Sequence, residues 1–416
     1  MRILLSAYAC EPEKGSEPGV GWNWVNQIAR FHEVWVITRA NNQARIEKAL
    51  ASSPLPNVHW VYVDLPRWAL FWKKERRGLH LYYFLWQLAA YFRARKLHRQ
   101  VGFDLAHHVT LVNYWMPSLL PLLPVLFIWG PVGGGESTPA VFWWSLSLRG
   151  KVYEAMRGLA RRMSELNPLL RLGARRAALG LATTPETAKR LRAVGCRKVS
   201  LSSEAGLTGD ESLQLSSFPF RENNIFRVAS VGNLLHLKGF ELGLQAFARF
   251  QRRFPTAEYW IIGDGPERKR LERLARKLRI ADKVMFTGVL RRQKVLERLA
   301  ECDVLLHPAL HDSGGWVCLE AMAAGRPVIC LDLGGPPFQV TDETGMAVPA
   351  SSPQQAICDL AAAMMRLAED PALRFRLAQA GRQRVAVQFD WDQKGNFMAN
   401  LYATLKKDGV DWITSA

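Results

Sequence analysis

Residues 306–337 read LHPALHDSGGWVCLEAMAAGRPVICLDLGGPP and place two acidic side chains, Asp312 and Glu320, eight positions apart around a glycine-rich turn. The apolar residues before this stretch predict a buried strand, residues 313–315 a tight turn, and residues 319–324 a helix. A helix N-terminus offers amide donors and a partial positive charge to a phosphorylated ligand, while carboxylates accept hydrogen bonds from hydroxyls. The stretch therefore indicates a site for a sugar nucleotide.

Short apolar runs alternate with helix-length segments along the chain in two successive series, which is typical of parallel sheets with crossover helices. The runs are residues 3–7, 34–38, 59–63, 105–109 and 125–129, then 228–231, 258–262, 283–286, 304–307 and 327–331. The polar stretch 207–224 between the series predicts an irregular linker. We therefore expect an α/β protein with two doubly wound, Rossmann-like domains, residues 1–206 and 225–390, facing each other across a cleft at the carboxyl ends of their strands.

The composition is that of an ordinary globular protein. A chain of 416 residues can form two domains with cores of their own. No apolar run approaches the roughly 20 residues that cross a bilayer, and the first ten residues lack the pattern of a signal peptide. The six cysteines are scattered without a C-x-x-C pair, which argues against a zinc site or a disulfide framework. We expect a cytoplasmic protein with reduced cysteines.

The formal net charge of +18 is unevenly distributed. Residues 1–200 contain 28 basic and 12 acidic side chains, a formal charge of +16, whereas the remainder contains 27 and 25. Such an asymmetry indicates an anionic partner for the first domain, either nucleic acid or an anionic membrane surface. No recognisable nucleic-acid module accompanies it, which weighs against the first of these.

The opening stretch resembles the retaining glycosyltransferases of family four, the glycosyl transferases group 1. Their signature is an acidic residue, seven others, and then Glu in an E-A-M-A-x-G-x-P-V-I context, and this chain has Asp312 where that family usually has Glu. The resemblance implies the GT-B fold, a nucleoside diphosphate sugar (UDP or GDP) as donor on the second domain, and no cofactor. It also implies that a C-terminal helix, residues 391–416, packs back on the first domain.

In the second domain, SVGNLLHLKGF places Lys238 beside a glycine, where its ammonium can act as a point charge on a leaving diphosphate. Asn233 stands where the resembled family has Arg. The resemblance assigns Glu320 to the ribose hydroxyls and Asp312 to the transferred sugar, although an Asp before a turn can equally cap a helix. It assigns fourteen residues to the donor: Gly15, Ser16, Asn233, Lys238, Gly263, Gly265, Val289, Asp312, Ser313, Gly314, Gly315, Trp316, Val317 and Glu320.

In the first domain the resemblance implicates the two adjacent histidines of FDLAHHVTLVNYW. Because successive strand side chains point to opposite faces, only one of His107 and His108 can face the site, and we favour His108 as catalytic and His107 as a core residue. The glycines of GPVGGGE suggest that Gly134 and Glu136 line the acceptor site, though a plain turn explains them equally well. We assign His107, His108, Gly134 and Glu136 to the acceptor.

Two further patterns bear on partners. Asp390-Trp391-Asp392 looks like a metal-binding D-x-D, but its place at a helix start indicates a cap, so we expect no metal site. Residues 65–99 mix bulky aromatics with basic side chains, which suits an anionic membrane interface; the alternative is an amphipathic helix whose aromatics form core. The aromatic residues 142–144 and the basic run 149–176 add a second such contact.

These patterns predict a retaining, metal-independent glycosyltransferase that transfers a hexose to a lipid-linked or glycan acceptor in cell-envelope or exopolysaccharide assembly, such as lipopolysaccharide. We expect it to lie at the inner face of the membrane as a peripheral protein. A sugar-nucleotide epimerase, a phosphorylase with pyridoxal phosphate, or transfer to a soluble small molecule remain alternatives.

Overall fold

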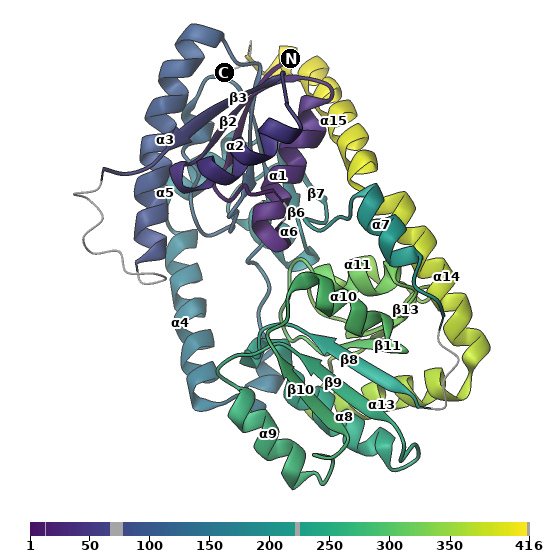
Figure 1. Ribbon diagram of the computed structural model, residues 1–416. Helices are drawn as coiled ribbons and strands as arrows, with labels where there is room; N and C mark the ends of the chain where they lie inside the picture. The colour runs from purple at the N-terminus through teal and green to yellow at the C-terminus, as the bar shows by residue number, and fades with distance from the viewer. Residues whose placement is uncertain (13, 67–77, 221–224, 414–416) are drawn as a thin grey trace. The chain divides into compact units, whose positions relative to one another are not determined.

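The computed structural model describes residues 1–12, 14–66, 78–220 and 225–413. The chain divides into two compact units, each built around a parallel sheet (Figure 1). Unit 1 is Met1–Gly135, Leu159–Glu204 and Trp391–Ala416, and unit 2 is Glu136–Gly158 and Ala205–Asp390. The prediction of two doubly wound α/β sheets is confirmed.

The sheet of unit 1 has the strand order β3-β2-β1-β4-β5-β6-β7 within the described residues. Its strands are β1 (Arg2–Ala7), β2 (Glu33–Arg39), β3 (Val58–Val63), β4 (Leu105–Thr110), β5 (Leu126–Val132), β6 (Leu179–Ala182) and β7 (Val199–Leu201). Its helices are α1 (Ser16–Ala29), α2 (Gln43–Ser52), α3 (Leu79–Val101), α5 (Pro168–Arg176), α6 (Pro185–Ala193) and α15 (Trp391–Ile413), with 3-10 turns η1 (Ala40–Asn42) and η3 (Leu120–Leu122).

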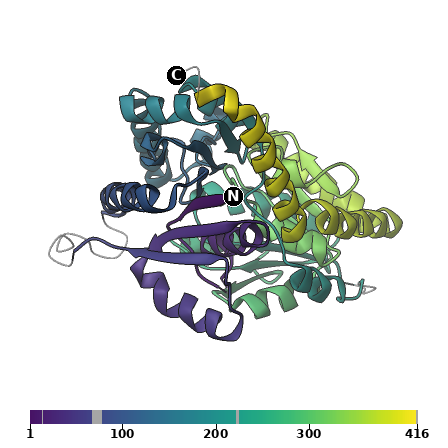
Figure 2. The ribbon, with the colours of Figure 1, turned by 90° about the horizontal axis from the view of Figure 1, so that it is seen from above.

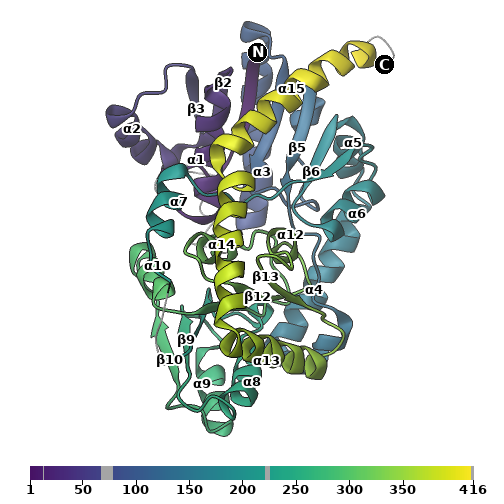
Figure 3. The same cartoon turned by 90° about the vertical axis from the view of Figure 1, so that its right-hand side faces the viewer.

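The two faces of this sheet are covered by different helices. Apolar side chains of α3, α5 and α6 form one core with Leu4, Ala106 and Phe127 of the strands. On the other face α15, drawn in yellow in Figure 3, packs along α1, where Trp391 and Trp24 meet edge to face at 5.3 Å. Further along α15, drawn in yellow in Figure 2, Lys406 Nζ lies 3.0 Å from Asp104.

The sheet of unit 2 has the order β10-β9-β8-β11-β12-β13. Its strands are β8 (Arg227–Val231), β9 (Glu258–Ile262), β10 (Val284–Gly288), β11 (Val304–His307), β12 (Val328–Leu331) and β13 (Gly345–Val348). Its helices are α7 (Gly209–Ser216), α8 (Phe240–Gln251), α9 (Arg268–Lys277), α10 (Arg292–Ala300), α11 (Trp316–Ala323), α12 (Pro336–Gln339), α13 (Pro353–Glu369) and α14 (Pro371–Gln388), with the 3-10 turn η5 (His236–Lys238). Chain order reverses between β8 and β11, which is where open α/β sheets bind ligands.

The expected irregular linker, residues 207–224, contains helix α7. Thr208 caps this helix, and Glu211 returns a hydrogen bond to the backbone of Thr208, which completes a capping box. Leu207 and Leu215 are buried in a core that α7 shares with α10, α11 and α14. Polar composition concealed a short helix because Leu215 is the only buried residue among Gly209–Ser216.

One segment groups with a different unit from its neighbours in sequence. Residues 136–158, which the strand pattern had placed in the first domain, belong to unit 2. They include the 3-10 turn η4 (Ala140–Ser145) and the start of α4 (Leu148–Glu165). Phe142 and Leu146 enter the apolar core of β8, α8 and α13, and this burial anchors the segment.

None of the helices within the described residues combines the length and the hydropathy needed to cross a membrane. The six cysteines are free, and all but Cys358 are buried. Burial raises the pKa of Cys318, which lies next to the stretch that opened the sequence analysis, so this thiol is not an activated nucleophile.

Lys394 on α15 predicts a pH dependence of stability. Its Nζ donates to the carbonyl of Ser203 at 2.6 Å, and burial lowers the pKa of this lysine to about 7. Above that pH the folded protein loses the proton, while the unfolded chain keeps it up to the ordinary value of 10.5. Unfolding then takes up a proton, so stability rises with pH between about 7 and 10, by at most about 1.4 kcal/mol per pH unit.

The measurement is the free energy of unfolding in urea at pH 7 and pH 9, for wild type and for Lys394→Met. Wild type should gain stability relative to the variant over this range. Parallel pH profiles of the two proteins would show that Lys394 keeps its proton in the fold.

Candidate functional site

The candidate site lies in unit 2, at the carboxyl ends of the neighbouring strands β8 and β11. Lys238 ends the 3-10 turn that follows β8, and Asp312 lies five residues beyond β11. Lys238 Nζ donates to Asp312 Oδ2 at 2.6 Å. The fold therefore brings together two residues that the sequence had assigned to the diphosphate and to the sugar.

His307, the last residue of β11, completes this cluster and was not predicted. Its Nε2 lies 2.9 Å from the same Asp312 oxygen, and its side chain is almost fully buried. A polar residue at the end of an otherwise apolar strand was the signal that could have identified it. His307 and Lys238 together orient the Asp312 carboxylate.

The electrostatics of Asp312 follow from these contacts. Burial by itself would raise the pKa of this carboxyl, but the Lys238 ammonium and the hydrogen bond from His307 outweigh it and hold the pKa well below the ordinary range. Asp312 is therefore ionised at neutral pH. Its Oδ1 lies 3.4 Å from the Gly315 amide, and Gly315 rather than Asp312 is the N-cap residue of α11.

Glu320, on the second turn of α11, is buried rather than exposed. Its Oε1 accepts hydrogen bonds from Arg292 at 3.0 and 3.2 Å, and Arg292 also pairs with Glu211 of α7. Burial raises the pKa of Glu320, and the Arg292 guanidinium opposes that rise. Arg292 is the second functional candidate missed from sequence, since nothing in the chain marks a residue 28 positions away as the partner of Glu320.

The turn between Asp312 and α11 is shaped by a second pair of glycines. Gly334 and Gly335 approach so closely that a Cβ on either would lie 2.3 Å or less from the carbonyl oxygen of Asp312 or Ser313. Gly315 has a φ of 54° and no side chain caps the helix that follows. The half-buried Trp316 and Val317 begin α11, and the contact of the Gly315 amide with Asp312 shows that this carboxylate lies beside the N-terminus of the helix.

The glycines of IIGDGPE are needed by the protein itself. A Cβ on Gly263, whose φ is 139°, would lie 2.0 Å from the carbonyl oxygen of Gly232, and one on Gly265 would lie 2.7 Å from that of Leu234. Both glycines are therefore required by the close packing of this strand-to-helix turn. Asn233, in the loop after β8, is exposed, and so is Val289 after β10.

A buried ionisable cluster connects residues 136–158 to the two loops that present Lys238 and Asp312. Glu154 of α4 lies 3.4 Å from His236 Nε2, and Glu136 lies 3.6 Å from His311 Nε2. Burial lowers the pKa of His311 to about 4, so this imidazole is neutral at pH 7. Each glutamate thus contacts a histidine one or two residues from Asp312 or Lys238. Glu136, predicted to bind the acceptor, is buried here and partnered by protein.

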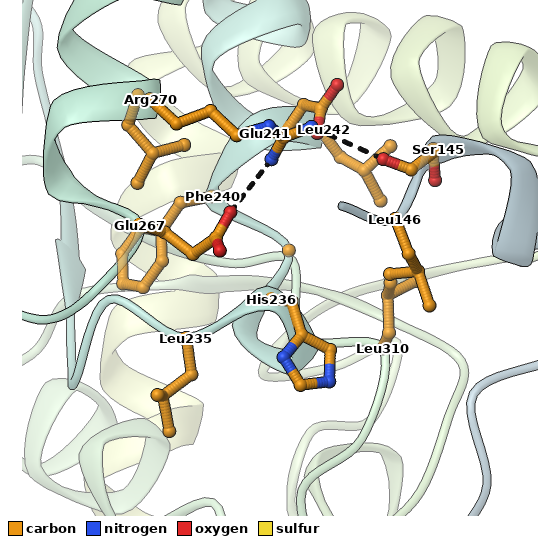
Figure 4. A pocket seen from close by; sticks show the side chains of 12 residues that line it. Ser145, Leu146, Leu235, His236, Phe240, Glu241, Leu242, Glu267, Arg270 and Leu310 are labelled. Carbon is orange, nitrogen blue, oxygen red and sulfur yellow. Dashed lines mark hydrogen bonds and ion pairs between the residues drawn. The ribbon is translucent and has the colours of Figure 1, made fainter. Parts of the chain in front are cut away.

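The cavity drawn in Figure 4 lies on the other side of the Lys238 turn. It is lined by His236, Phe240 and Leu310, together with Ser145 and Leu146 of the segment 136–158. Arg270 spans it, pairing with Glu267 at 3.0 Å and with Glu241, and donating to the Ser145 carbonyl at 3.3 Å. Neither Lys238 nor Asp312 lines this cavity, so we do not identify it with the candidate site.

His107 and His108, adjacent on β4, point to opposite faces of the unit 1 sheet, as predicted. His107 contacts Tyr402 of α15 and the Gly130 carbonyl, both at 2.6 Å, and burial lowers its pKa to about 3. His108 lies 2.9 Å from the Tyr83 hydroxyl of α3, and burial lowers its pKa to about 4. Both are buried among protein groups, and His108, which we favoured as catalytic, lies beneath α3.

The other unit 1 candidates occupy loops. Gly15 is the N-cap residue of α1, and Ser16 has a φ of 62°, a conformation that favours the glycine found there in the resembled family. Gly134 has a φ of 88°, and a Cβ there would lie 2.7 Å from Asn113 Oδ1. Asp392 of the D-x-D lies 2.8 Å from both Arg30 and Gln27, so this carboxylate is engaged within unit 1.

The aromatic and basic segment 65–99 is described only in part. Tyr82 and Trp86 are fully buried, so for these two the alternative of a core helix holds. Phe92 is exposed. The expected membrane contacts at residues 68–77, which include Lys73, Lys74, Arg76 and Arg77, lie outside the described residues.

Comparison with known proteins identifies the second half of the chain. Residues 217–384 match the family model of the glycosyl transferases group 1. Glycogen synthase of Mycobacterium tuberculosis is 33% identical over 178 residues, 42% of this chain and 42% of that protein. The lipopolysaccharide core biosynthesis glycosyltransferase LpsD of Rhizobium meliloti is 32% identical over 164 residues, 39% of this chain and 45% of that protein. The chain thus aligns with less than half the length of these curated relatives.

A solved structure extends the likeness to the whole chain at the level of fold. Anabaena Alr3699/HepE in complex with UDP-glucose superposes with a TM-score of 0.56 at 16% identity, covering 100% of both chains. With two doubly wound parallel sheets in sequence, the chain has the GT-B fold that the resemblance implied.

Proposed function

Since residues 217–384 belong to the glycosyl transferases group 1, we propose that this protein transfers a hexose from a nucleoside diphosphate sugar, UDP or GDP, to a lipid-linked or glycan acceptor. Transfer proceeds with retention of the anomeric configuration and without a metal ion. The alternative acceptor is a soluble small molecule.

The contact between Lys238 and Asp312 carries this proposal. In this contact a cation lies 2.6 Å from a carboxylate. The pair lies at the ends of β8 and β11, where the chain order of the unit 2 sheet reverses, and beside the N-terminus of α11. A donor would place its diphosphate against Lys238 and the helix amides, and its sugar hydroxyls against Asp312. Lys238 is about one-fifth exposed, so its ammonium can turn from Asp312 to an entering diphosphate.

Chemistry at this site consists of one bond exchange. The bond between the sugar C1 and the diphosphate oxygen breaks, and the diphosphate leaves with the electron pair. The acceptor hydroxyl oxygen bonds to C1 on the same face and gives its proton to the departing diphosphate. Lys238 and the α11 amides stabilise the negative charge that develops on the leaving group, and Asp312 holds the sugar.

Glu320 binds the ribose of the nucleotide in this proposal. Its carboxylate is held by Arg292, which leaves the second oxygen for hydroxyl donors. HepE, which shares the fold, was solved with UDP-glucose, and this supports a nucleotide sugar as the donor.

The acceptor belongs to the cell envelope in our proposal. LpsD is named for lipopolysaccharide core biosynthesis, and glycogen synthase acts by name on a glycan. The +16 charge of residues 1–200 fits a phosphorylated, lipid-linked glycan at an anionic membrane surface, where the protein would act as a peripheral protein.

The test is nucleotide binding and turnover in chelator. Calorimetry in EDTA should detect UDP or GDP binding, and a thermal-shift series should show about 2.7 kcal/mol of stabilisation at 100 times the dissociation constant. Sugar transfer from the matching donor should likewise survive EDTA. Binding that appears only with magnesium or manganese would refute the metal-free mechanism, and binding of neither nucleotide would refute the proposed donor.

A further inference from the structure

Helix α4 presents a row of large apolar side chains to solvent. Trp144 of η4 is 88% exposed, Leu148 79% and Met156 67%. With Val152, also exposed, they form what we call the α4 apolar face, which lies within unit 2. Leu148, Val152 and Met156 follow one another at intervals of four residues, which places them on one side of α4, and Trp144 precedes the helix.

The distribution of charged and apolar side chains on α4 is the reverse of that on an ordinary surface helix. Surface helices bury their apolar stripe and expose their charges. Here Glu154 is 3% exposed and pairs with His236, whereas Leu148 and Met156 lie outside. Because the inner side of α4 is already occupied by buried ionic contacts, the apolar face is not a core surface of the described fold.

The charges around this face have one sign. Arg149 is exposed on α4, and Lys151 lies over the Trp144 ring at 5.4 Å. The only acidic residues between 137 and 176 are Glu154, which is buried, and Glu165, which pairs with Arg190 at 2.6 Å. Exposed apolar side chains flanked by cations and free of exposed carboxylates are the chemistry that binds an anionic lipid surface.

We propose that the α4 apolar face docks on an anionic bilayer, with its leucine, methionine and tryptophan side chains entering the acyl boundary and its basic side chains contacting lipid phosphates. The docking proposal rests on the proposed function in one respect: a lipid-linked acceptor lies at such a surface. It places the membrane contact at residues 144–156, which include the start of α4 (Figure 1), rather than at residues 65–99.

The experiment is flotation with vesicles of phosphatidylcholine and phosphatidylglycerol at 3:1, and with phosphatidylcholine alone. Wild type should float with the anionic vesicles in 50 mM salt, and should remain unbound in 500 mM salt and with the neutral vesicles. The variant Trp144→Ser, Leu148→Ser, Met156→Ser should lose at least about tenfold in apparent partition coefficient. Its matched control, Leu213→Ser with Val387→Ser, removes exposed apolar side chains of α7 and α14 and should float like wild type.

A second set of variants, which remove basic side chains, distinguishes docking on anionic lipid from nonspecific adsorption. Arg149→Ser with Lys151→Ser should lower partitioning strongly, whereas Arg276→Ser with Lys277→Ser, on exposed positions of α9, should not. A third variant replaces Lys73, Lys74, Arg76 and Arg77 by Ser. Loss of flotation in that variant alone would overturn the assignment to α4.

The outcome of the flotation experiment does not depend on sugar transfer. UDP and GDP binding, measured by calorimetry on the same preparations, should be equal in wild type and the α4 variants, which also shows that the variants are folded. Flotation without nucleotide binding would remove the proposed function and leave the docking surface standing. Nucleotide binding without flotation, or equal flotation of wild type and the apolar variant, would overturn the docking proposal.

Discussion

Replacing Lys238 by methionine is expected to lower kcat for sugar transfer about 100- to 1000-fold. Methionine keeps most of the side-chain length but removes the charge that opposes the negative charge on the departing diphosphate, and loss of one such interaction has effects of this size. Asp312 keeps a partner in the variant, because His307 contacts the same carboxylate oxygen at 2.9 Å. The fold should therefore persist while turnover fails.

Single-turnover rates with saturating donor are the measurement, alongside thermal unfolding. The matched control is Lys294→Met on α10, an exposed lysine that pairs with Glu297 at 2.6 Å and should leave kcat unchanged. Should Lys238→Met retain kcat within threefold of wild type, Lys238 would not act on the leaving group.

The second large effect separates the two carboxylates. Asp312→Asn should lower kcat about 100-fold and leave UDP or GDP affinity within threefold, because Asp312 is assigned to the transferred sugar. Glu320→Ala should weaken nucleotide affinity about tenfold or more, since a site built to bind hydroxyls loses its acceptor. Arg292 retains Glu211 as an ion-pair partner in that variant, so the local charges stay balanced.

Nucleotide affinity by calorimetry and kcat by product formation together test this division. Glu301→Gln, an exposed carboxylate that pairs with Arg298 at 3.2 Å, is the control for general charge effects. Equal losses of nucleotide affinity in Asp312→Asn and Glu320→Ala would contradict separate roles for the two residues.

Apolar runs predicted ten of the thirteen strands in the described residues and missed β6, β7 and β13. Each of the ten predicted runs overlaps an observed strand, because both faces of a parallel sheet are buried and its strands are correspondingly apolar. Helix α7 was missed for the opposite reason. Its burial rests on a few side chains such as Leu215, and its start is marked only by Thr208 and Glu211.

Site residues were predicted where a local motif marks them and missed where only a tertiary contact does. Asp312 and Glu320 lie within one turn and helix, so a local pattern identified both. Their partners His307 and Arg292 became visible only when the sheet and α10 placed them within 2.9 and 3.0 Å. The adjacent histidines were predicted to face opposite sides of a strand, but α3 decided that His108 is covered.

By itself, the sequence determined the fold class, the parallel strands and the local glycine-rich turn with its two acids, because these depend on hydrophobic periodicity and on short-range backbone geometry. Tertiary structure alone decided which charges pair and which helix faces are covered. Lys238 and Asp312 are 74 positions apart, and Glu154 and His236 are 82 positions apart. Those pairings follow from the order of strands in the sheet. The exposure of apolar side chains on α4 follows from the buried contacts on its inner side. Neither feature is encoded in a local spacing of residues.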